Sequence, residues 1–172
     1  MCSWCWAFKP AWDKVKVALL GKVKVDYLLG GLASDSNEPM PIETREYVKG
    51  NWKRIQGMIP DIRFNYDFWT SCEPKRSTYP ACRAVICAKQ QHPDFENLMI
   101  YGIQKSYYLE AQNPSNDDVL INIAESLGLD SDKFKIANDW DDLHNNTKLT
   151  IDTSGNVGIG TTNPAYKLDV NG

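Results

Sequence analysis

The stretch that most restricts the fold is residues 22–29, where polar and apolar side chains alternate before Gly30-Gly31. This period of two predicts a β-strand that is polar on one face at its start and buried towards its end. Helical periodicity precedes it from Trp4 to about Leu20, with Gly21 as the stop, although 14–17 also alternates with strand period. One helix followed by one strand is half of an α/β unit.

The next hundred or so residues have helical rather than strand periodicity. The short aromatic segment 62–69 favours a packing loop or a small helix. The pattern and the capping residues predict helices over about 43–56, from Ser77 or Thr78 onward, from Asp94 towards Gln112, from Ser115 or Asn116 to Gly128, and from Asp130 or Ser131 to about Trp140. A helical middle of this size indicates a large helical insertion, residues 33–145, behind a partial α/β unit at 1–32.

The last segment, residues 146–172, differs in composition from everything before it. Threonine, glycine and asparagine replace long apolar and charged side chains, and short alternating stretches are separated by the turns 154–156 and Asn163-Pro164. We therefore expect a short β-rich C-terminal tail, with a domain boundary near residue 146.

The chemistry of the chain centres on Cys2 and Cys5, two thiols separated by two residues at the start of the first predicted helix. This spacing is typical of dithiols that exchange disulfides. If Cys2 lies at the N-cap and Cys5 one turn further on, both sulfurs can form a tight disulfide. The unpaired N–H groups and the positive end of the helix dipole would stabilise a thiolate at Cys2, the nucleophile, and Cys5 would be the resolving thiol.

A Cys-x-x-Cys pair has two other interpretations, a zinc site and a structural disulfide. A zinc site needs four ligands, but Cys72, Cys82 and Cys87 do not form a second pair of that spacing, and His92 and His144 stand alone. A structural disulfide is disfavoured because a four-residue loop constrains the unfolded chain little. No metal and no cofactor are therefore expected.

The remaining thiols favour a structural interpretation. Five cysteines are an odd number, which argues against a fully paired disulfide framework. Cys82 and Cys87 are five residues apart and do not share a helix face. Cys72, Cys82 and Cys87 are therefore expected to be buried free cysteines that act as small hydrophobes.

Charge and hydropathy exclude several classes of partner. A net charge of −3 gives no electrostatic footprint for nucleic acid or an anionic membrane. No apolar run reaches the length of a membrane span, and no signal peptide is recognisable, so we expect a cytoplasmic protein. The predicted partners are protein or small-molecule thiols and disulfides.

Four segments in order, Met1–Phe8, Leu29–Leu32, Arg76–Val85 and Ile103–Pro114, resemble the DsbA-like branch of thioredoxin-fold disulfide oxidoreductases. The resemblance covers residues 1–143. It implies that Cys2 is the exposed nucleophile and Cys5 the buried resolving thiol. The family's strand before the dithiol and its cis-proline strand are not recognisable here, so the expected fold is an incomplete α/β thioredoxin-like fold with a helical insertion.

The tail resembles a different group of proteins. Gly155 to Gly172 is similar to a repeat of bacteriophage tail-fibre proteins, which implies a trimeric β-structure and a homo-oligomer formed through the tail. The predicted function is thiol–disulfide oxidoreductase. The alternatives are a non-catalytic interaction fragment with a trimerising tail, and a glutathione-dependent isomerase or transferase, whose relatives usually replace one or both cysteines.

Overall fold

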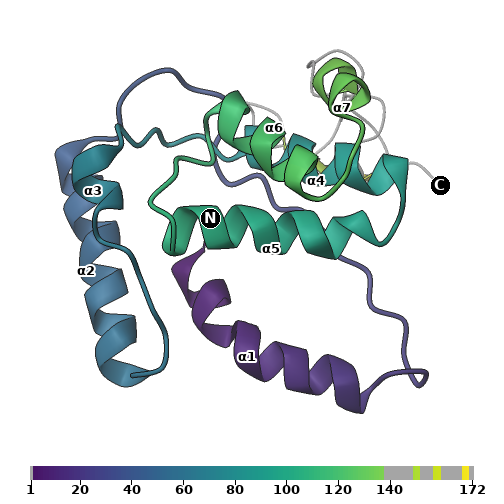
Figure 1. Ribbon diagram of the computed structural model, residues 1–172, viewed down its shortest axis with the longest axis horizontal. Helices are drawn as coiled ribbons and strands as arrows, with labels where there is room; N and C mark the ends of the chain where they lie inside the picture. The colour runs from purple at the N-terminus through teal and green to yellow at the C-terminus, as the bar shows by residue number, and fades with distance from the viewer. Residues whose placement is uncertain (1, 138–148, 152–156, 160–167, 171–172) are drawn as a thin grey trace.

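The computed structural model describes residues 2–137, 149–151, 157–159 and 168–170, and the first of these ranges is built from helices (Figure 1). The helices are α1 (Ser3–Ala18), α2 (Ile42–Met58), α3 (Phe68–Ser71), α4 (Tyr79–Gln91), α5 (Phe95–Tyr108), α6 (Asp117–Ser126) and α7 (Ser131–Ala137). None of these helices combines the length and the apolar character that a membrane span needs.

The predicted helix starts are confirmed. Thr78, Asp94 and Asn116 occupy the N-cap positions of α4, α5 and α6. Gly128 follows α6 with φ +79°, a left-handed conformation that glycine adopts without steric cost. The predicted helix ends differ by a few residues: α5 ends at Tyr108, before the expected end at Gln112, and Ala111 beyond it has φ 54°. The end expected near Trp140 lies outside the described residues.

The strand predicted at 22–29 is wrong for this structure. Residues 23–32 form no helix, turn, bend or ladder, and Figure 1 shows them as the long connection that leaves α1. A strand is defined by backbone hydrogen bonds to a neighbouring strand, and none of the described segments pairs with this one. The α/β class is therefore not seen in residues 2–137, which are helical.

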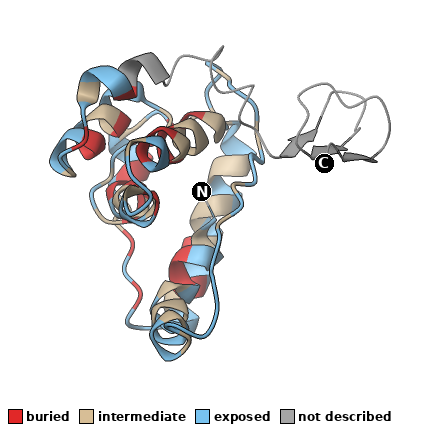
Figure 2. Cartoon of the chain, turned by 90° about the vertical axis from the view of Figure 1, so that its right-hand side faces the viewer, coloured by how far each residue is buried: buried red, intermediate tan, exposed pale blue. Residues whose placement is uncertain are grey.

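The larger apolar core lies between α4, α5, α6 and α7. It is centred on side chains that are fully or almost fully buried: Ala84, Val85, Cys87, Ala88, Met99, Ile103, Leu120, Ile123, Ala124, Leu129 and Phe134. Gly102 lets α5 approach α6, since a Cβ built on it would lie 2.6 Å from Cγ2 of Ile123. Figure 2 shows the buried positions in red within these helices and the exposed ones in blue around them.

A second core is aromatic and joins α1, α2, α3 and the end of α5. Its members are Trp6, Ala7, Trp52, Ile55, Ile62, Phe64, Phe68, Trp69, Tyr107 and Tyr108. Trp52 is completely buried at its centre, with Phe64 stacked at 5.0 Å and Tyr108 edge-on at 5.5 Å between ring centroids. Because α5 contributes Ile103 to one core and Tyr108 to the other, it links the two.

The connection after α1 is tied to the start of α4. Thr78 N–H donates to the carbonyl of Ala33 at 3.1 Å, and the Thr78 hydroxyl bonds both the N–H and the carbonyl of Ala33 at 2.9 Å. Gly31 passes so close to Tyr79 that a Cβ there would lie 2.5 Å from Cε1 of the ring. Any larger residue at position 31 would therefore require the Tyr79 ring to shift.

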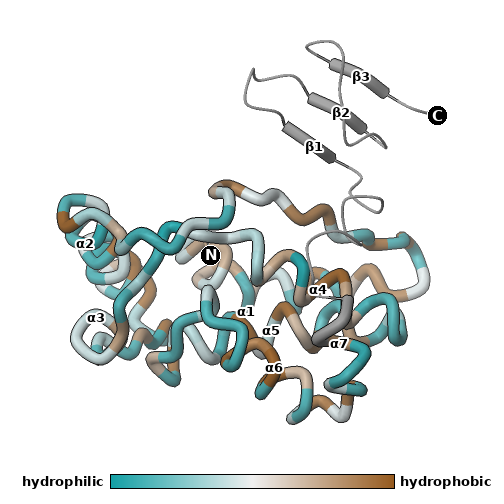
Figure 3. Tube along the Cα trace, turned by 90° about the horizontal axis from the view of Figure 1, so that it is seen from above, coloured by the Kyte–Doolittle hydropathy of each residue, from teal (hydrophilic) through white to brown (hydrophobic). Residues whose placement is uncertain are grey.

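Three short strands lie in the C-terminal segment. β1 (Leu149–Ile151) pairs antiparallel with β2 (Val157–Ile159), and β2 pairs parallel with β3 (Leu168–Val170). Figure 3 draws them in this order. Strands were expected in this part of the chain, whereas the predicted boundary near residue 146 and His144 lie outside the described residues.

Candidate dithiol site

Cys2 occupies the N-cap of α1. Its backbone is extended, with φ −104° and ψ 114°, and its Sγ accepts a hydrogen bond from the backbone N–H of Cys5 at 3.4 Å. The first turn of α1 contains no acidic side chain that would offset the positive end of the helix dipole. A negative charge on this sulfur would therefore meet both an N–H donor and a favourable dipole.

Cys5 lies one turn into the helix in a different environment. Both thiols are free and their residues exposed, so the expectation that Cys5 is buried is wrong. Partial burial, then the hydrogen bond to Cys2 and then the charge of Cys2 raise the pKa of Cys5 to about 11. Cys5 therefore keeps its proton at neutral pH.

The first turn of α1 is fixed to the aromatic core by Trp6, the residue after Cys5. Its ring stacks on Tyr108 with centroids 5.4 Å apart, and its Nε1 donates to the carbonyl of Arg63 at 3.1 Å. Trp6 and Ala7 are the buried residues of this helix. The exposed dithiol is thus presented from a turn whose orientation is set by packing.

An apolar groove of about 740 Å³ begins at the dithiol and runs between α1, the connection after it, α4 and α5. Cys2 and Cys5 line one part of it, and Phe8, Trp12 and Leu28 line others. A volume in this range is typical of ligand sites. A disulfide held in the groove would lie beside the two thiols.

Three charged side chains of α1 also line this groove. Asp13 is paired with Lys9 and, at 3.0 Å, with Lys16. The hydrogen bond from Lys9 holds the pKa of the Asp13 carboxyl below its usual range. Lys9 also lies 4.9 Å above the centroid of the Tyr101 ring. Two cations and one anion leave this wall of the groove with one net positive charge.

The other cysteines do not form a second dithiol among the described residues. The Cys72 thiol donates to the carbonyl of Ala111 at 3.0 Å. Burial raises the pKa of the Cys87 thiol to about 11, as expected for a cysteine that acts as a small hydrophobe. Cys82 is half-buried and lines the dithiol groove, which its sequence position did not indicate.

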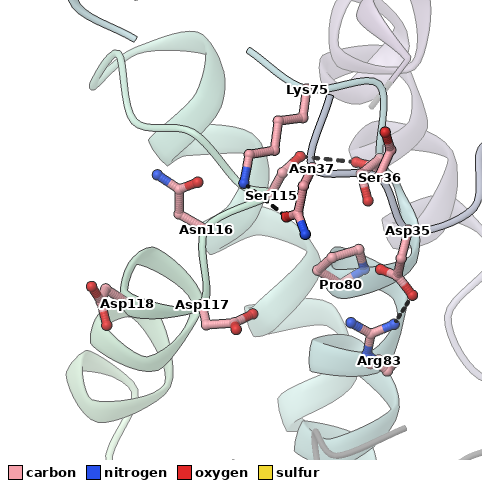
Figure 4. Close-up of a pocket in the computed structure, with 11 residues that line it drawn as sticks. Asp35, Ser36, Asn37, Lys75, Pro80, Arg83, Ser115, Asn116, Asp117 and Asp118 are labelled. Carbon is pink, nitrogen blue, oxygen red and sulfur yellow. Dashed lines mark hydrogen bonds and ion pairs between the residues drawn. The ribbon is translucent and has the colours of Figure 1, made fainter. Parts of the chain in front are cut away.

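A separate polar pocket of about 500 Å³ lies between the loop at Asp35, the start of α4 and the start of α6 (Figure 4). Arg83 pairs with Asp35 at 2.7 Å, and Lys75 donates to Asn37 at 3.4 Å. Both acidic and basic side chains line this pocket, and neither Cys2 nor Cys5 is among its lining residues. No group of three or more His, Cys, Asp or Glu side chains in the described residues is placed to hold a metal ion.

Comparison of the sequence with known families gives one match, to a family described as thioredoxin, over residues 1–155. Similar curated proteins are the ClpXP adapter protein SpxH of Halalkalibacterium halodurans, 27% identical over 84% of this chain and 46% of that protein, and SpxH of Bacillus subtilis, 26% identical over 87% and 47%. The chain thus spans about half the length of the curated relatives it matches.

Solved structures share the fold. A putative protein disulfide isomerase from Nitrosomonas europaea superposes with a TM-score of 0.69 at 23% identity, covering 82% of this chain and 67% of that one. The cytosolic disulfide reductase DsbM from Pseudomonas aeruginosa gives a TM-score of 0.64 at 21% identity, covering 80% and 66%. These likenesses show a thioredoxin-like fold for a chain whose residues 2–137 are helical.

Proposed function

Since this chain belongs to the thioredoxin family, we propose that it is a DsbA-like thiol–disulfide oxidoreductase, with Cys2 as the nucleophile and Cys5 as the resolving thiol. The observation that carries the proposal is the contact between Cys2 Sγ at the N-cap and the Cys5 N–H. This contact places the Cys2 sulfur beside a backbone donor at the start of a helix, which is the position that a nucleophilic sulfur in disulfide exchange would use.

The proposed reaction has two displacements. The Cys2 thiolate attacks one sulfur of a partner disulfide, forms a mixed disulfide with it, and expels the other sulfur as a thiolate. Cys5 then loses its proton and attacks Cys2 Sγ, which releases the second partner thiolate and leaves a Cys2–Cys5 disulfide. The partner gains two electrons and this chain loses two, and the reverse sequence oxidises a partner dithiol.

The raised pKa of the Cys5 thiol supports its role as the resolving thiol. Because the pKa of Cys5 is raised to about 11, Cys5 does not compete as the nucleophile at neutral pH. It can lose its proton as the mixed disulfide forms, since the charge of Cys2, one cause of the raised pKa, then disappears.

Partners and location follow from the same proposal. Partners are protein or small-molecule thiols and disulfides held in the groove beside the dithiol, and the chemistry needs no cofactor. One structural neighbour is a cytosolic disulfide reductase, and one of its structures is described with GSH. We also propose that the protein is cytoplasmic. The chain would divide into three parts, residues 1–32, 33–145 and 146–172.

Two single substitutions test the proposed roles. Cys2→Ser removes the nucleophile, so reduction of a model disulfide should fall by at least about a hundredfold. Cys5→Ser should keep the first displacement and accumulate a mixed disulfide at Cys2, detected by mass spectrometry. Cys72→Ser is the matched control and should retain wild-type turnover. Equal activity in the wild type and Cys2→Ser would contradict the proposal.

A second candidate is a binding protein without turnover, favoured by the adapter names of the curated relatives. In this alternative the β-rich, tail-fibre-like segment forms a trimer and the dithiol is not used. It predicts an inactive wild type and a trimer that is lost when residues 146–172 are deleted, measured by size-exclusion chromatography with light scattering.

A further inference from the structure

Tyr108, the last residue of α5, has a buried hydroxyl with no hydrogen-bond partner among the described residues. The residue is completely buried, and solvent does not reach its hydroxyl oxygen. Leaving a buried hydroxyl unpaired costs free energy, so such a group needs a structural or functional explanation. A further segment of polypeptide could reach this oxygen only by opening the core. The explanation therefore has to lie among the residues around it.

The ring of Tyr108 packs against the helical turn that carries the dithiol. Trp6 stacks on this ring with 5.4 Å between centroids and 22° between ring planes. The Trp6 N–H in turn donates to the carbonyl of Cys2 at 3.2 Å. Figure 1 shows the start of α1 beside the C-terminal end of α5. Tyr108 is therefore a neighbour of the first turn of α1.

The hydroxyl and the dithiol act on each other electrostatically. Burial, then the charge of Tyr107, and then the charges of Cys2 and Cys5 raise the pKa of Tyr108 well above its usual value. Tyr108 therefore keeps its proton at neutral pH and remains a donor. A hydroxyl proton can rotate about the C–O bond, so it can turn towards whichever neighbour becomes negative.

Of the two sulfurs of the dithiol, Cys5 is the one without a donor. The Cys2 sulfur accepts from the backbone N–H of Cys5 at 3.4 Å, whereas no N–H of a described residue donates to the Cys5 sulfur. Burial and the neighbouring Cys2 raise the pKa of Cys5 to about 11, and the charge of the amino terminus acts the other way. Cys5 has to carry negative charge in the proposed second displacement, so a donor dipole near it would speed that step.

We infer that Tyr108 assists the resolving thiol: its buried hydroxyl turns its proton towards Cys5 as negative charge develops there, and this dipole speeds the second displacement. The inference rests on the proposed function and adds a residue to it. The Cys5 proton leaves to solvent, which reaches this exposed residue, and Tyr108 keeps its own proton. The Cys5 sulfur then bonds to Cys2 Sγ while the bond from Cys2 to the partner sulfur breaks. Because the hydroxyl is enclosed in the aromatic core, water screens its dipole little.

Tyr108→Phe tests the hydroxyl while keeping the ring. Reduced protein is mixed with one equivalent of dithiobis(nitrobenzoate) in a stopped-flow spectrophotometer. One coloured thiolate is released when Cys2 forms the mixed disulfide and a second when Cys5 resolves it. In Tyr108→Phe the first phase should be unchanged, whereas the second should slow by about tenfold and reach half its maximum rate at a higher pH. Urea unfolding should show equal or greater stability, because an unpaired buried hydroxyl has been removed.

Tyr107→Phe is the matched control. It removes a hydroxyl from the adjacent buried tyrosine of the same core, where burial and then the charge of Cys72, rather than the dithiol, raise the pKa. This variant should leave both phases unchanged, and Cys5→Ser, which should lose the second phase, identifies that phase.

Two kinds of result separate this inference from the proposed function. Equal second phases in the wild type and Tyr108→Phe would overturn the inference alone. So would equal slowing in Tyr107→Phe, or a slowing of both phases together in Tyr108→Phe. A wild type without a second phase would contradict the proposed function and this inference with it.

Discussion

The two thiols of the dithiol occupy different positions of the same helical turn. Cys2 accepts from a backbone N–H at the N-cap, while burial and the neighbouring sulfur keep the proton on Cys5. The i, i+3 spacing predicted this arrangement because it depends only on local helix geometry. The groove beside it could not be predicted, since Trp12, Leu28, Cys82 and Tyr101 come from four segments that only the tertiary fold brings together.

The reactivity of Cys5 should follow the causes of its raised pKa. In Cys2→Ser the thiol of Cys5 keeps its burial but loses the charge of the neighbouring sulfur, so its pKa should fall from about 11 yet stay above the ordinary 9.0. The rate of iodoacetamide alkylation at Cys5, followed by mass spectrometry against pH, should have its midpoint between these values. A midpoint below pH 9 would show that burial is not the main cause.

At the scale of elements, helix starts were predictable and the strand was not. Helix caps and helical periodicity are local, so Thr78, Asp94 and Asn116 could be identified from their neighbours in sequence. A ladder depends on a partner strand, and alternation at 22–29 carries no information about whether one is present. The close packing of α5 on α6 at Gly102 could not be predicted from the sequence either. It depends on Ile123, which lies 21 positions further along the chain.

Gly102→Ala should destabilise the protein although alanine favours helices. The added Cβ would lie 2.6 Å from Cγ2 of Ile123, a stiff methyl group, so we expect a loss of about 1–3 kcal/mol in urea unfolding. Ile123→Leu removes that methyl group, so the double variant should recover part of the loss.

The matched control is Gly50→Ala in α2, where nothing lies within 4 Å of the added Cβ. This variant should gain about 0.5–1 kcal/mol from helix propensity alone. If both alanine variants were stabilised equally, the tight contact between α5 and α6 would be refuted.

At the scale of the whole molecule, the described residues form two cores, and the aromatic one contains Trp6 and Ala7, which follow the dithiol in α1. Trp6 belongs to the aromatic core around Trp52, whereas Phe134 belongs to the apolar core between α4 and α7. The thioredoxin-like fold was predictable from ordered segment matches, and the family match over residues 1–155 agrees with it. The division into two cores was not, because aromatic residues of distant segments assemble the second one.

Trp52→Ala and Phe134→Ala should therefore differ in their effect on chemistry. Both side chains are completely buried, and each truncation should cost about 3–5 kcal/mol of stability. Only Trp52→Ala removes the ring that packs against Tyr108, the stacking partner of Trp6, so only this variant should slow alkylation of Cys2 at neutral pH. The comparison requires conditions in which far-ultraviolet circular dichroism shows both variants folded. Equal slowing in both would contradict this assignment.

The stacked position of Trp6 beside Cys5 has an optical consequence. If Cys2 and Cys5 form a disulfide as proposed, the neighbouring indole of Trp6 should lose emission, because a disulfide quenches the excited state of a nearby indole. Trp52, in the aromatic core away from the surface, supplies a steadier background signal. A titration of the proposed dithiol with a redox buffer should therefore be measurable from tryptophan emission without any added label.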